Sequence, residues 1–295
     1  MSRHNLTDKE WNAIRPLLPK ERTGKPGRPW RSHREVVDGI MFLIRTGIPW
    51  RDLPAEFGPW QTVYKRFRRW QKDRIWERLV AKILKRFLSD GEIDFELWCI
   101  DGTIVRAHRA AAGARKHGEL AEGNAEKNAL GRSRRGFSTK LHLLTDGQGI
   151  PLGVTLTPGQ SNEGREFPNV IAASIVSIYR LCNRPAALAG DKAYATNAIR
   201  QALRTKGIND IIPSRSHERD NPNFDCRLYR IRNVVERFIG WLKEYRRIAT
   251  RYEKLAKNYL AVIHIALFRM LLNWDEETGP KPRNCLFMRH IIACP

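Results

Sequence analysis

Residues 229–243, YRIRNVVERFIGWLK, carry apolar and polar positions with a helical period. At about 100° per residue, one face collects the apolar side chains Val234, Val235, Phe238, Ile239 and Leu242. The neighbouring face carries a polar stripe roughly 60° wide, made of Tyr229, Arg232, Glu236 and Lys243. The pattern predicts a helix that buries one side and holds a carboxylate along its edge. A solvated charged face is the alternative interpretation.

Residues 1–90 show the helical period in several shorter segments. Thr7 and Glu10 have the spacing of a capping box and predict the start of a first helix. A second helix is predicted from Ser32 to Gly47, with apolar residues on its core face. This part of the chain is therefore expected to be an all-α domain.

The third helical segment begins near Pro59 and places aromatic residues three or four positions apart, with bases between them. The aromatic residues predict a core stripe, and the bases predict an outward face. A short turn followed by a basic helix resembles a helix-turn-helix, whose second helix lies in the major groove of DNA. The expected DNA contacts are Lys65, Arg66, Arg68 and Arg69. Ordinary packing between helices is the alternative.

The chain from residue 91 changes character and predicts an α/β domain. Strands are expected over residues 95–100, 137–146, 149–157, 185–190 and 208–213, and helices over 162–178, 197–206, 229–243 and 259–274. A three-strand meander followed by strands joined through helices is the order of an RNase H-like domain with a mixed five-stranded sheet. Asp101 ends the first strand, Asp191 ends the fourth and Glu236 lies on a late helix. The three carboxylates can therefore converge at one edge of the sheet.

The charge of the 295-residue chain favours a polyanionic partner. The net charge is +22 at pH 7 and the sequence pI is about 10.3, which points to DNA or RNA. Residues 1–90 hold 21 Lys and Arg residues against 10 Asp and Glu residues, an excess of 11 that supports DNA binding there. No apolar run reaches the roughly 20 residues of a membrane span. The five scattered cysteines form no CxxC pair, which favours a reducing cytoplasm.

Three acids in a basic chain suggest metal ions held against a nucleic-acid backbone. Two divalent ions roughly 3.5–4 Å apart activate the attacking oxygen and stabilise the leaving oxygen of a phosphodiester. Mg²⁺ prefers hard carboxylate oxygens, so Asp101 is expected to bridge both ions, with Asp191 and Glu236 each completing one shell. Basic surroundings are expected to keep these acids ionised. The expected phosphate contacts are Tyr229, Arg232, Lys243, Lys192 and Lys140.

Each of these residues also has a simpler interpretation. Asp101 could form a turn with Gly102, and Asp191 could pair with its neighbour on the surface. His108 and His142 are expected to be structural rather than metal ligands. Asp146 precedes a glycine and predicts a turn.

Several motifs, taken together, resemble a known family. They are IDGTIVRAH, GRSRRGFSTKLHLLTDGQGIPL, LTPGQ, GDKAY and the spacing of Tyr229, Arg232, Glu236 and Lys243. The chain resembles the DDE transposases of bacterial insertion sequences, specifically the insertion sequence five group, over about residues 5–273. RTGIPWRDLPAEFGPWQTVYKRFRRW is similar to the DNA-binding region of the same group.

The resemblance implies that Asp101, Asp191 and Glu236 form a catalytic triad that uses two Mg²⁺ or Mn²⁺ ions. The implied substrates are the terminal inverted repeats of the element and a target DNA, which are cleaved and joined by strand transfer. Relatives act as homodimers or higher oligomers, and the implied location is the nucleoid in the bacterial cytoplasm.

The expected organisation is a DNA-binding domain over 1–90, a catalytic domain over 91–274 and a tail over 275–295. Two alternatives remain open from the sequence. One is a DNA-binding relic without catalysis, and the other is an RNase H-like nuclease that serves the host.

Overall fold

The computed structural model describes residues 5–21, 30–113, 128–133, 136–174, 184–216, 221–222 and 224–274. The predicted tail lies outside the described residues, and so do residues 114–127 and 134–135 of the basic stretch. The end of the helix predicted over 162–178 also falls outside them.

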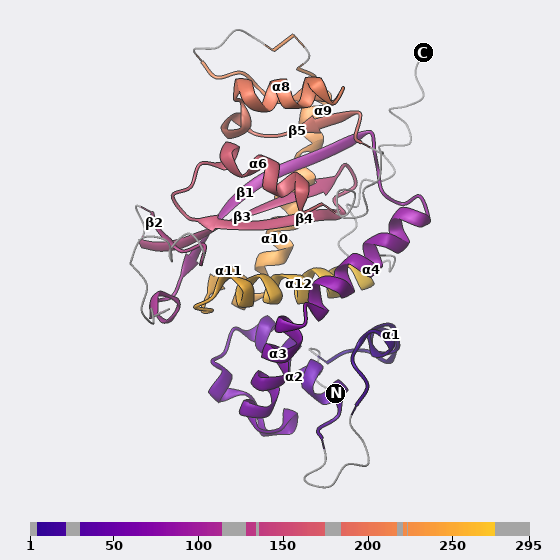
Figure 1. The fold of residues 1–295 in the computed structure, drawn as a ribbon, viewed down its shortest axis with the longest axis vertical. Helices are drawn as coiled ribbons and strands as arrows, with labels where there is room; N and C mark the ends of the chain where they lie inside the picture. The colour runs from indigo at the N-terminus through magenta and orange to yellow at the C-terminus, as the bar shows by residue number, and fades with distance from the viewer. Residues whose placement is uncertain are drawn as a thin grey trace.

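The described N-terminal region is helical, as predicted, and forms the lower part of the molecule in Figure 1. Its elements are α1 (Asp8–Ile14), η1 (Arg15–Leu17), α2 (His33–Thr46), η2 (Trp50–Asp52), η3 (Ala55–Phe57), α3 (Trp60–Lys72) and α4 (Ile75–Ser89), where η denotes a 3-10 helix. The capping box of α1 is confirmed: the Glu10 N–H donates to Thr7 Oγ1 (3.2 Å) and the Thr7 N–H donates to Glu10 Oε2 (2.7 Å).

The connection between α2 and α3 differs from the short turn that was expected. It runs over residues 47–59 and contains two 3-10 turns. Pro49, Pro54 and Pro59 each stand directly before a helical segment. Because proline lacks an N–H and fixes φ, it is favoured at helix starts and prevents α2 from running on through this segment.

The second part of the chain is built on a mixed sheet. Its strands are β1 (Leu97–Ala107), β2 (Gly131–Ser133), β3 (Gly136–Asp146), β4 (Pro151–Pro158), β5 (Ala187–Ala189), β6 (Asn209–Ile211) and β7 (Thr250–Arg251). The five main strands lie in the order β4-β3-β1-β5-β6, with β4, β3 and β1 antiparallel and β1, β5 and β6 parallel. The predicted mixed five-stranded, RNase H-like arrangement is thus confirmed, and the short strands β2 and β7 add to it.

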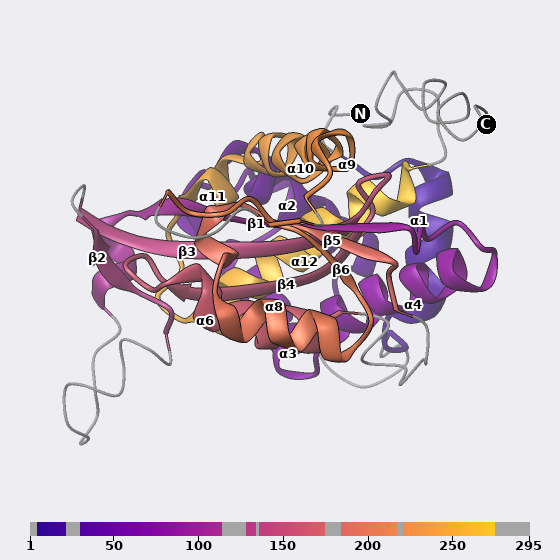
Figure 2. The same ribbon diagram turned by 90° about the horizontal axis from the view of Figure 1, so that it is seen from above.

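Helices cover both faces of the sheet (Figure 2). They are α6 (Glu163–Ala172), α8 (Asn197–Thr205), α9 (Cys226–Ile231), α10 (Asn233–Lys243), α11 (Arg246–Ala249) and α12 (Ala256–Leu272), with η4 (Arg109–Gly113) and η5 (Lys192–Tyr194) between strands and helices. Helices α9 and α10 lie over one face, and α6 and α8 lie over the other. Helix α12 lies between the sheet and the N-terminal helices (Figure 1).

The helix predicted over 229–243 is interrupted at Arg232, which ends α9 and precedes α10. At this junction the N–H groups of Arg232 and Val235 donate to the carbonyl oxygens three residues earlier, at Tyr229 and Arg232. Arg232 keeps helical dihedral angles, and α10 still buries the five apolar residues that define its face.

One apolar core runs through the N-terminal helices and the sheet region, and partly buried polar contacts also join them. The Arg247 guanidinium donates to the carbonyl oxygen of Ile48 (2.7 Å), and Arg269 pairs with Glu10 (3.0 Å). The boundary expected at residue 90 stays a prediction. In this conformation the helices are held against the sheet.

Candidate active site

Asp101 lies within the long strand β1. It stands opposite Leu143 in the β1–β3 ladder, and the strand continues to Ala107. The expectation that Asp101 ends the strand is therefore wrong, and so is its interpretation as a turn residue. One of its carboxylate oxygens accepts a hydrogen bond from the Gly102 N–H (2.9 Å), and the side chain is 16% exposed.

Parallel strand pairing places Asp191 beside Asp101. Strands β1 and β5 pair in parallel up to Cys99 and Ala189, and each Asp lies two residues beyond its paired position. Because neighbouring parallel strands are about 4.8 Å apart, Asp191 leaves the sheet beside Asp101, while β1 continues. The Asp191 Oδ1 atom accepts from the Ala193 N–H (2.9 Å), so the side chain caps η5.

Helix α10 brings the third acid to β1. The Arg232 guanidinium lies 3.6 Å from Asp101 Oδ2 and donates a short hydrogen bond to Glu236 Oε1. At the far end of the helix, Lys243 Nζ donates to Thr103 Oγ1 (2.6 Å). The polar stripe predicted from the sequence thus faces β1, and Arg232 bridges two of the candidate acids.

Electrostatics show that the three acids influence one another. Burial raises the pKa of Asp101 to about 6; Arg232 and the Gly102 N–H oppose this shift, and the charges of Asp191 and Glu236 add to it. The expectation that basic surroundings keep the acids ionised stays a prediction; for the pKa of Asp101, desolvation outweighs the opposing effect of Arg232.

The donor set fits a divalent cation by its chemistry. Hard carboxylate oxygens are what Mg²⁺ and Mn²⁺ prefer, and a cation here would favour the ionised form of Asp101, whose pKa is raised mainly by burial. Among the described residues, no three His, Cys, Asp or Glu side chains already stand close enough to hold one ion. Arg232 supplies the positive charge between Asp101 and Glu236.

Comparison with known families agrees with this arrangement. The model described as "Putative transposase of IS4/5 family" matches residues 6–80, and the model described as "Transposase DDE domain" matches residues 94–271. The chain belongs to the DDE transposase family. The first match covers the helical N-terminal region, and the second covers the RNase H-like sheet and its helices.

Two relatives of this chain are also described as transposases of insertion sequences. The "Putative transposase for insertion sequence element IS6501" of Brucella ovis is 32% identical, over 44% of this chain and 95% of the relative. The "Putative transposase for insertion sequence element IS402" of Burkholderia cepacia is 32% identical, over 50% of this chain and 67% of the relative. A solved Mos1 mariner paired end complex with Mn is 15% identical with a TM-score of 0.27, covering 88% of this chain and 83% of that one. That last likeness is too low to carry an argument.

The bases predicted to contact DNA from the sheet side differ in exposure. Lys192 is exposed beside Asp191. Lys140 is buried, pairs with Glu163 (3.0 Å) and donates to the Ser161 carbonyl oxygen (2.9 Å). On α9, the ring of Tyr229 lies beneath the guanidinium of Arg232. Lys140 is thus turned inward in this conformation, whereas Lys192 is open to a ligand.

The bases of α3 also separate into exposed and buried groups. Lys65 and Arg69 are exposed, and Arg68 is half-buried against Tyr64. Arg66 is 6% exposed, stacks on Trp30 (4.3 Å from the ring centroid) and lies 2.6 Å from His33 Nδ1. In this conformation Arg66 packs within the helical region instead of pointing to solvent.

Two residues with expected structural roles have them. Asp146 closes the turn between β3 and β4, where its carboxylate accepts from the N–H groups of Asp94, Gln148 and Ile150. His142 is fully buried and lies 2.8 Å from the Thr157 hydroxyl.

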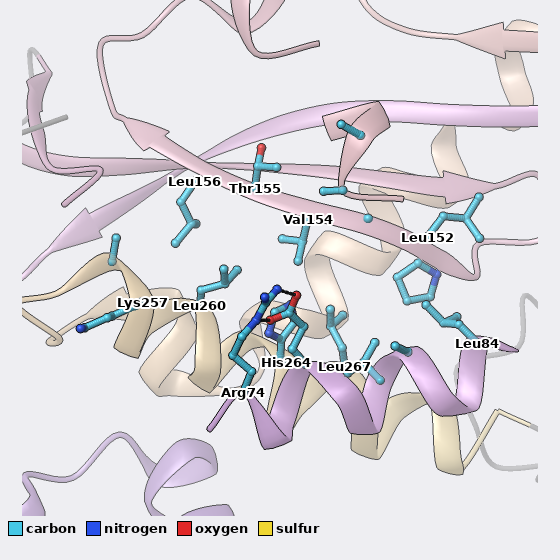
Figure 3. A pocket seen from close by; sticks show the side chains of 18 residues that line it. Arg74, Leu84, Leu152, Val154, Thr155, Leu156, Lys257, Leu260, His264 and Leu267 are labelled. Carbon is cyan, nitrogen blue, oxygen red and sulfur yellow. Dashed lines mark hydrogen bonds and ion pairs between the residues drawn. The ribbon is translucent and has the colours of Figure 1, made fainter. Parts of the chain in front are cut away.

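A cavity of about 550 Å³ lies away from the acids, between β4, α4 and α12 (Figure 3). Most of its lining is apolar, and Figure 3 shows Val154, Leu156 and Leu260 around it and Arg74 and His264 at one side. None of the three candidate acids lines this cavity. Among the described residues, no helix is both long and apolar enough to cross a bilayer.

Proposed function

We propose that this protein binds the terminal inverted repeats of its own insertion sequence and catalyses metal-dependent DNA cleavage and strand transfer. The proposed catalytic acids and metal ligands are Asp101, Asp191 and Glu236. The observation that carries the proposal is the placement of Asp101 and Asp191, each two residues beyond the last paired positions of the neighbouring parallel strands β1 and β5, with Glu236 joined to Asp101 through Arg232.

The proposed reaction has two phosphoryl-transfer steps. In the first, a water oxygen attacks the phosphorus at the end of the element, and the departing oxygen becomes a free 3′-hydroxyl. In the second, that hydroxyl attacks a target phosphodiester, the new P–O bond joins the element to the target, and the 3′ oxygen of the target strand leaves as a hydroxyl. Two bound Mg²⁺ or Mn²⁺ ions supply charge stabilisation of the attacking and leaving oxygens.

The described side chains support this chemistry in distinct ways. The three carboxylates hold the cations. Arg232 is placed to exchange its carboxylate partners for a DNA phosphate, because a guanidinium binds both groups in the same bidentate manner. Lys243 fixes the end of α10 to Thr103 on β1, close to the same phosphates.

DNA binding is proposed to use the exposed bases of α3, in particular Lys65 and Arg69, together with Lys192 near the acids. The net charge of +22 supports a polyanionic ligand. We further propose that the protein pairs two DNA ends as a homodimer or higher oligomer and acts at the bacterial nucleoid.

A cleavage and joining assay tests the function. Labelled DNA that carries the ends of the element is incubated with Mg²⁺ or with EDTA, and nicks and joined products are separated on a denaturing gel. We expect Mg²⁺-dependent nicks and joined products, both lost in Asp101→Asn. Asp90→Asn is the matched control, since it makes the same change at an exposed acid at the end of α4.

Other outcomes would point elsewhere. Nicks without joined products would favour a nuclease. Tight binding of the ends with no cleavage in either metal would favour a DNA-binding protein without catalysis. Normal cleavage by Asp101→Asn would remove this residue from the site.

A further inference from the structure

Helix α10 contains a glycine that the fold does not require. Gly240 is exposed and lies within the helix, four residues after Glu236. Its φ is not among the positive values that favour glycine. A Cβ atom built on this glycine would meet nothing within 4 Å. Neither the backbone conformation nor close packing against the described residues therefore accounts for a glycine at this position.

The glycines of two other helices are different in this respect. A Cβ atom built on Gly39 in α2 would lie 2.9 Å from the Cβ atom of Phe57. One built on Gly164 in α6 would lie 3.2 Å from the carbonyl oxygen of Ala193. Glycine is, after proline, the least favourable residue within a helix, and alanine fits at position 240. A glycine there is expected where another molecule comes close to the helix backbone.

Gly240 lies at the edge of the polar stripe that faces β1. At about 100° per residue, it is about 40° around the helix from Glu236 and about 60° from Lys243. Its neighbours on the helix surface are the residues three and four positions away, namely Glu236, Arg237, Lys243 and Glu244. Helical side chains lean toward the N-terminus, so a side chain at position 240 would cover the surface beside the proposed metal ligand Glu236.

The charges around this surface favour an anionic ligand. Glu244 pairs with Arg45, and Glu236 pairs with Arg232, so each of these acids has a cationic partner. Arg237 forms no hydrogen bond or ion pair with any described residue, and its Nε atom is buried without a partner. The charge left without a partner beside Gly240 is thus positive, which suits the phosphates of DNA.

The geometry points to Gly240 as the place where the sugar–phosphate backbone of the cleaved strand crosses α10 in direct contact with the helix backbone. This inference rests on the proposed function and adds a positioning contact to it. One helical turn rises about 5.4 Å, so a strand held at Glu236 needs only about one or two more nucleotides to reach Gly240. The contact would fix the path of the strand beside the acids.

Gly240→Gln tests the inference, because glutamine is a good helix former and adds an uncharged side chain to this surface. Single-turnover cleavage of DNA that carries the ends of the element should be about 100-fold slower, the loss that a misplacement of about 1 Å produces. Gly240→Ala adds one methyl group, and its rate should lie between those of Gly240→Gln and the wild type. The melting temperature of both variants should equal or exceed that of the wild type, since both residues favour a helix more than glycine does.

Ala202→Gln is the matched control. Ala202 is exposed within α8, which lies over the opposite face of the sheet from α10 (Figure 2). The same side chain is thus added to a helix on the other side of the sheet, and cleavage should proceed as in the wild type. Mn²⁺ binding without DNA, measured by electron paramagnetic resonance, should be unchanged in Gly240→Gln, because the contact concerns DNA and not the metal.

The other outcomes are distinguishable. If the wild type cleaves the ends of the element and Gly240→Gln cleaves them equally fast, the contact is refuted and the proposed function stands. If the wild type does not cleave them, the proposed function fails, and the inference fails with it. Slower cleavage with a lower melting temperature would give Gly240 a structural role and overturn the contact.

A second copy of the chain is the other molecule that such a surface could receive. If Gly240→Gln lowers the mass of the protein in light scattering without DNA, this face joins two protein copies and the DNA contact is refuted. Should Gly240→Gln fail to fold, Gly240→Ala tests the same contact, and wild-type cleavage by that variant would overturn the inference.

Discussion

The replacement of Arg66 by Met should reduce stability and leave the electrostatic part of DNA binding unchanged. The side chain lies 2.6 Å from His33 Nδ1, and its guanidinium stacks on Trp30 and Trp70. His33 Nε2 lies 2.8 Å from the Pro19 carbonyl oxygen, so the ring donates there and accepts from Arg66. Loss of one buried hydrogen bond costs about 1 kcal/mol, and loss of the cation–π contacts costs about 1 kcal/mol more.

A loss of about 2 kcal/mol should lower the melting temperature by roughly 4–8 °C in a chain of this size. Lys65→Met is the matched control on the same helix. Because Lys65 is exposed, its replacement should change stability by less than about 0.5 kcal/mol. If Lys65 contacts a phosphate, the slope of log affinity against log salt should become shallower by about 1.

Thermal melts and DNA-binding titrations at several salt concentrations measure both effects. The reasoning would be refuted if Arg66→Met melted like the wild type and reduced the salt slope as Lys65→Met does. That result would mean that Arg66 leaves its buried position and contacts phosphate.

Three further outcomes follow from the structure. Burial lowers the pKa of His33, so the unfolded chain binds more protons at this residue than the folded chain. The contribution of His33 to the free energy of unfolding should therefore be fully present above about pH 6.5 and be lost as the pH falls below it. Thermal melts at pH 5 and 7.5 measure this loss, which should be smaller in His33→Asn. Since the pKa of Asp101 is raised to about 6, protons compete with metal, and single-turnover cleavage should fall about tenfold per pH unit well below pH 6 and level off above pH 7. Arg251 is buried and donates hydrogen bonds to Ala129 and Thr139. Arg251→Met should lower the free energy of unfolding, measured by urea denaturation, by about 3 kcal/mol. Arg251→Lys should not restore stability, because an ammonium group lacks the planar fork of the guanidinium.

Apolar periodicity was enough to predict the sheet and the approximate position of the acids. The apolar runs before Asp101 and Asp191 are buried because parallel strands are covered on both faces, so the two acids could be located from sequence. The end of β1 could not, because the strand continues through less buried residues to Ala107. The spacing of Arg232, Glu236 and Lys243 also predicted which side of α10 faces β1. These features could be predicted because they depend on the local pattern of apolar residues and on the strand order of a single sheet topology.

Contacts between distant segments could not be predicted in the same way. The burial of Arg66 depends on Trp30, which precedes α2, and the inward turn of Lys140 depends on Glu163. Glu163 itself has the pattern of an ordinary first-turn acid, which the helix dipole favours. In the sequence, only the glycine after Asp101 hints that this carboxylate lies beside β1, because the missing side chain of the glycine makes room for it. Strand β7, with two residues, is too short to leave a periodic pattern.

The attachment of the N-terminal helices to the sheet has a consequence for how DNA would be presented. Arg45 of α2 pairs with Glu244 at the end of α10 (3.0 Å). Gly47 lies so close to Arg246 that a Cβ atom built on this glycine would be 3.0 Å from the Arg246 Cβ atom. The helix that carries the proposed metal ligand Glu236 therefore ends against the helical region. DNA held by α3 would lie at a fixed distance from the acids in this conformation, so the length of DNA between the bound sequence and the cut is set by the fold. Because the Arg45–Glu244 pair is exposed and the apolar core continues between the two regions, Glu244→Gln alone should leave the position of the nick, mapped on a denaturing gel, unchanged.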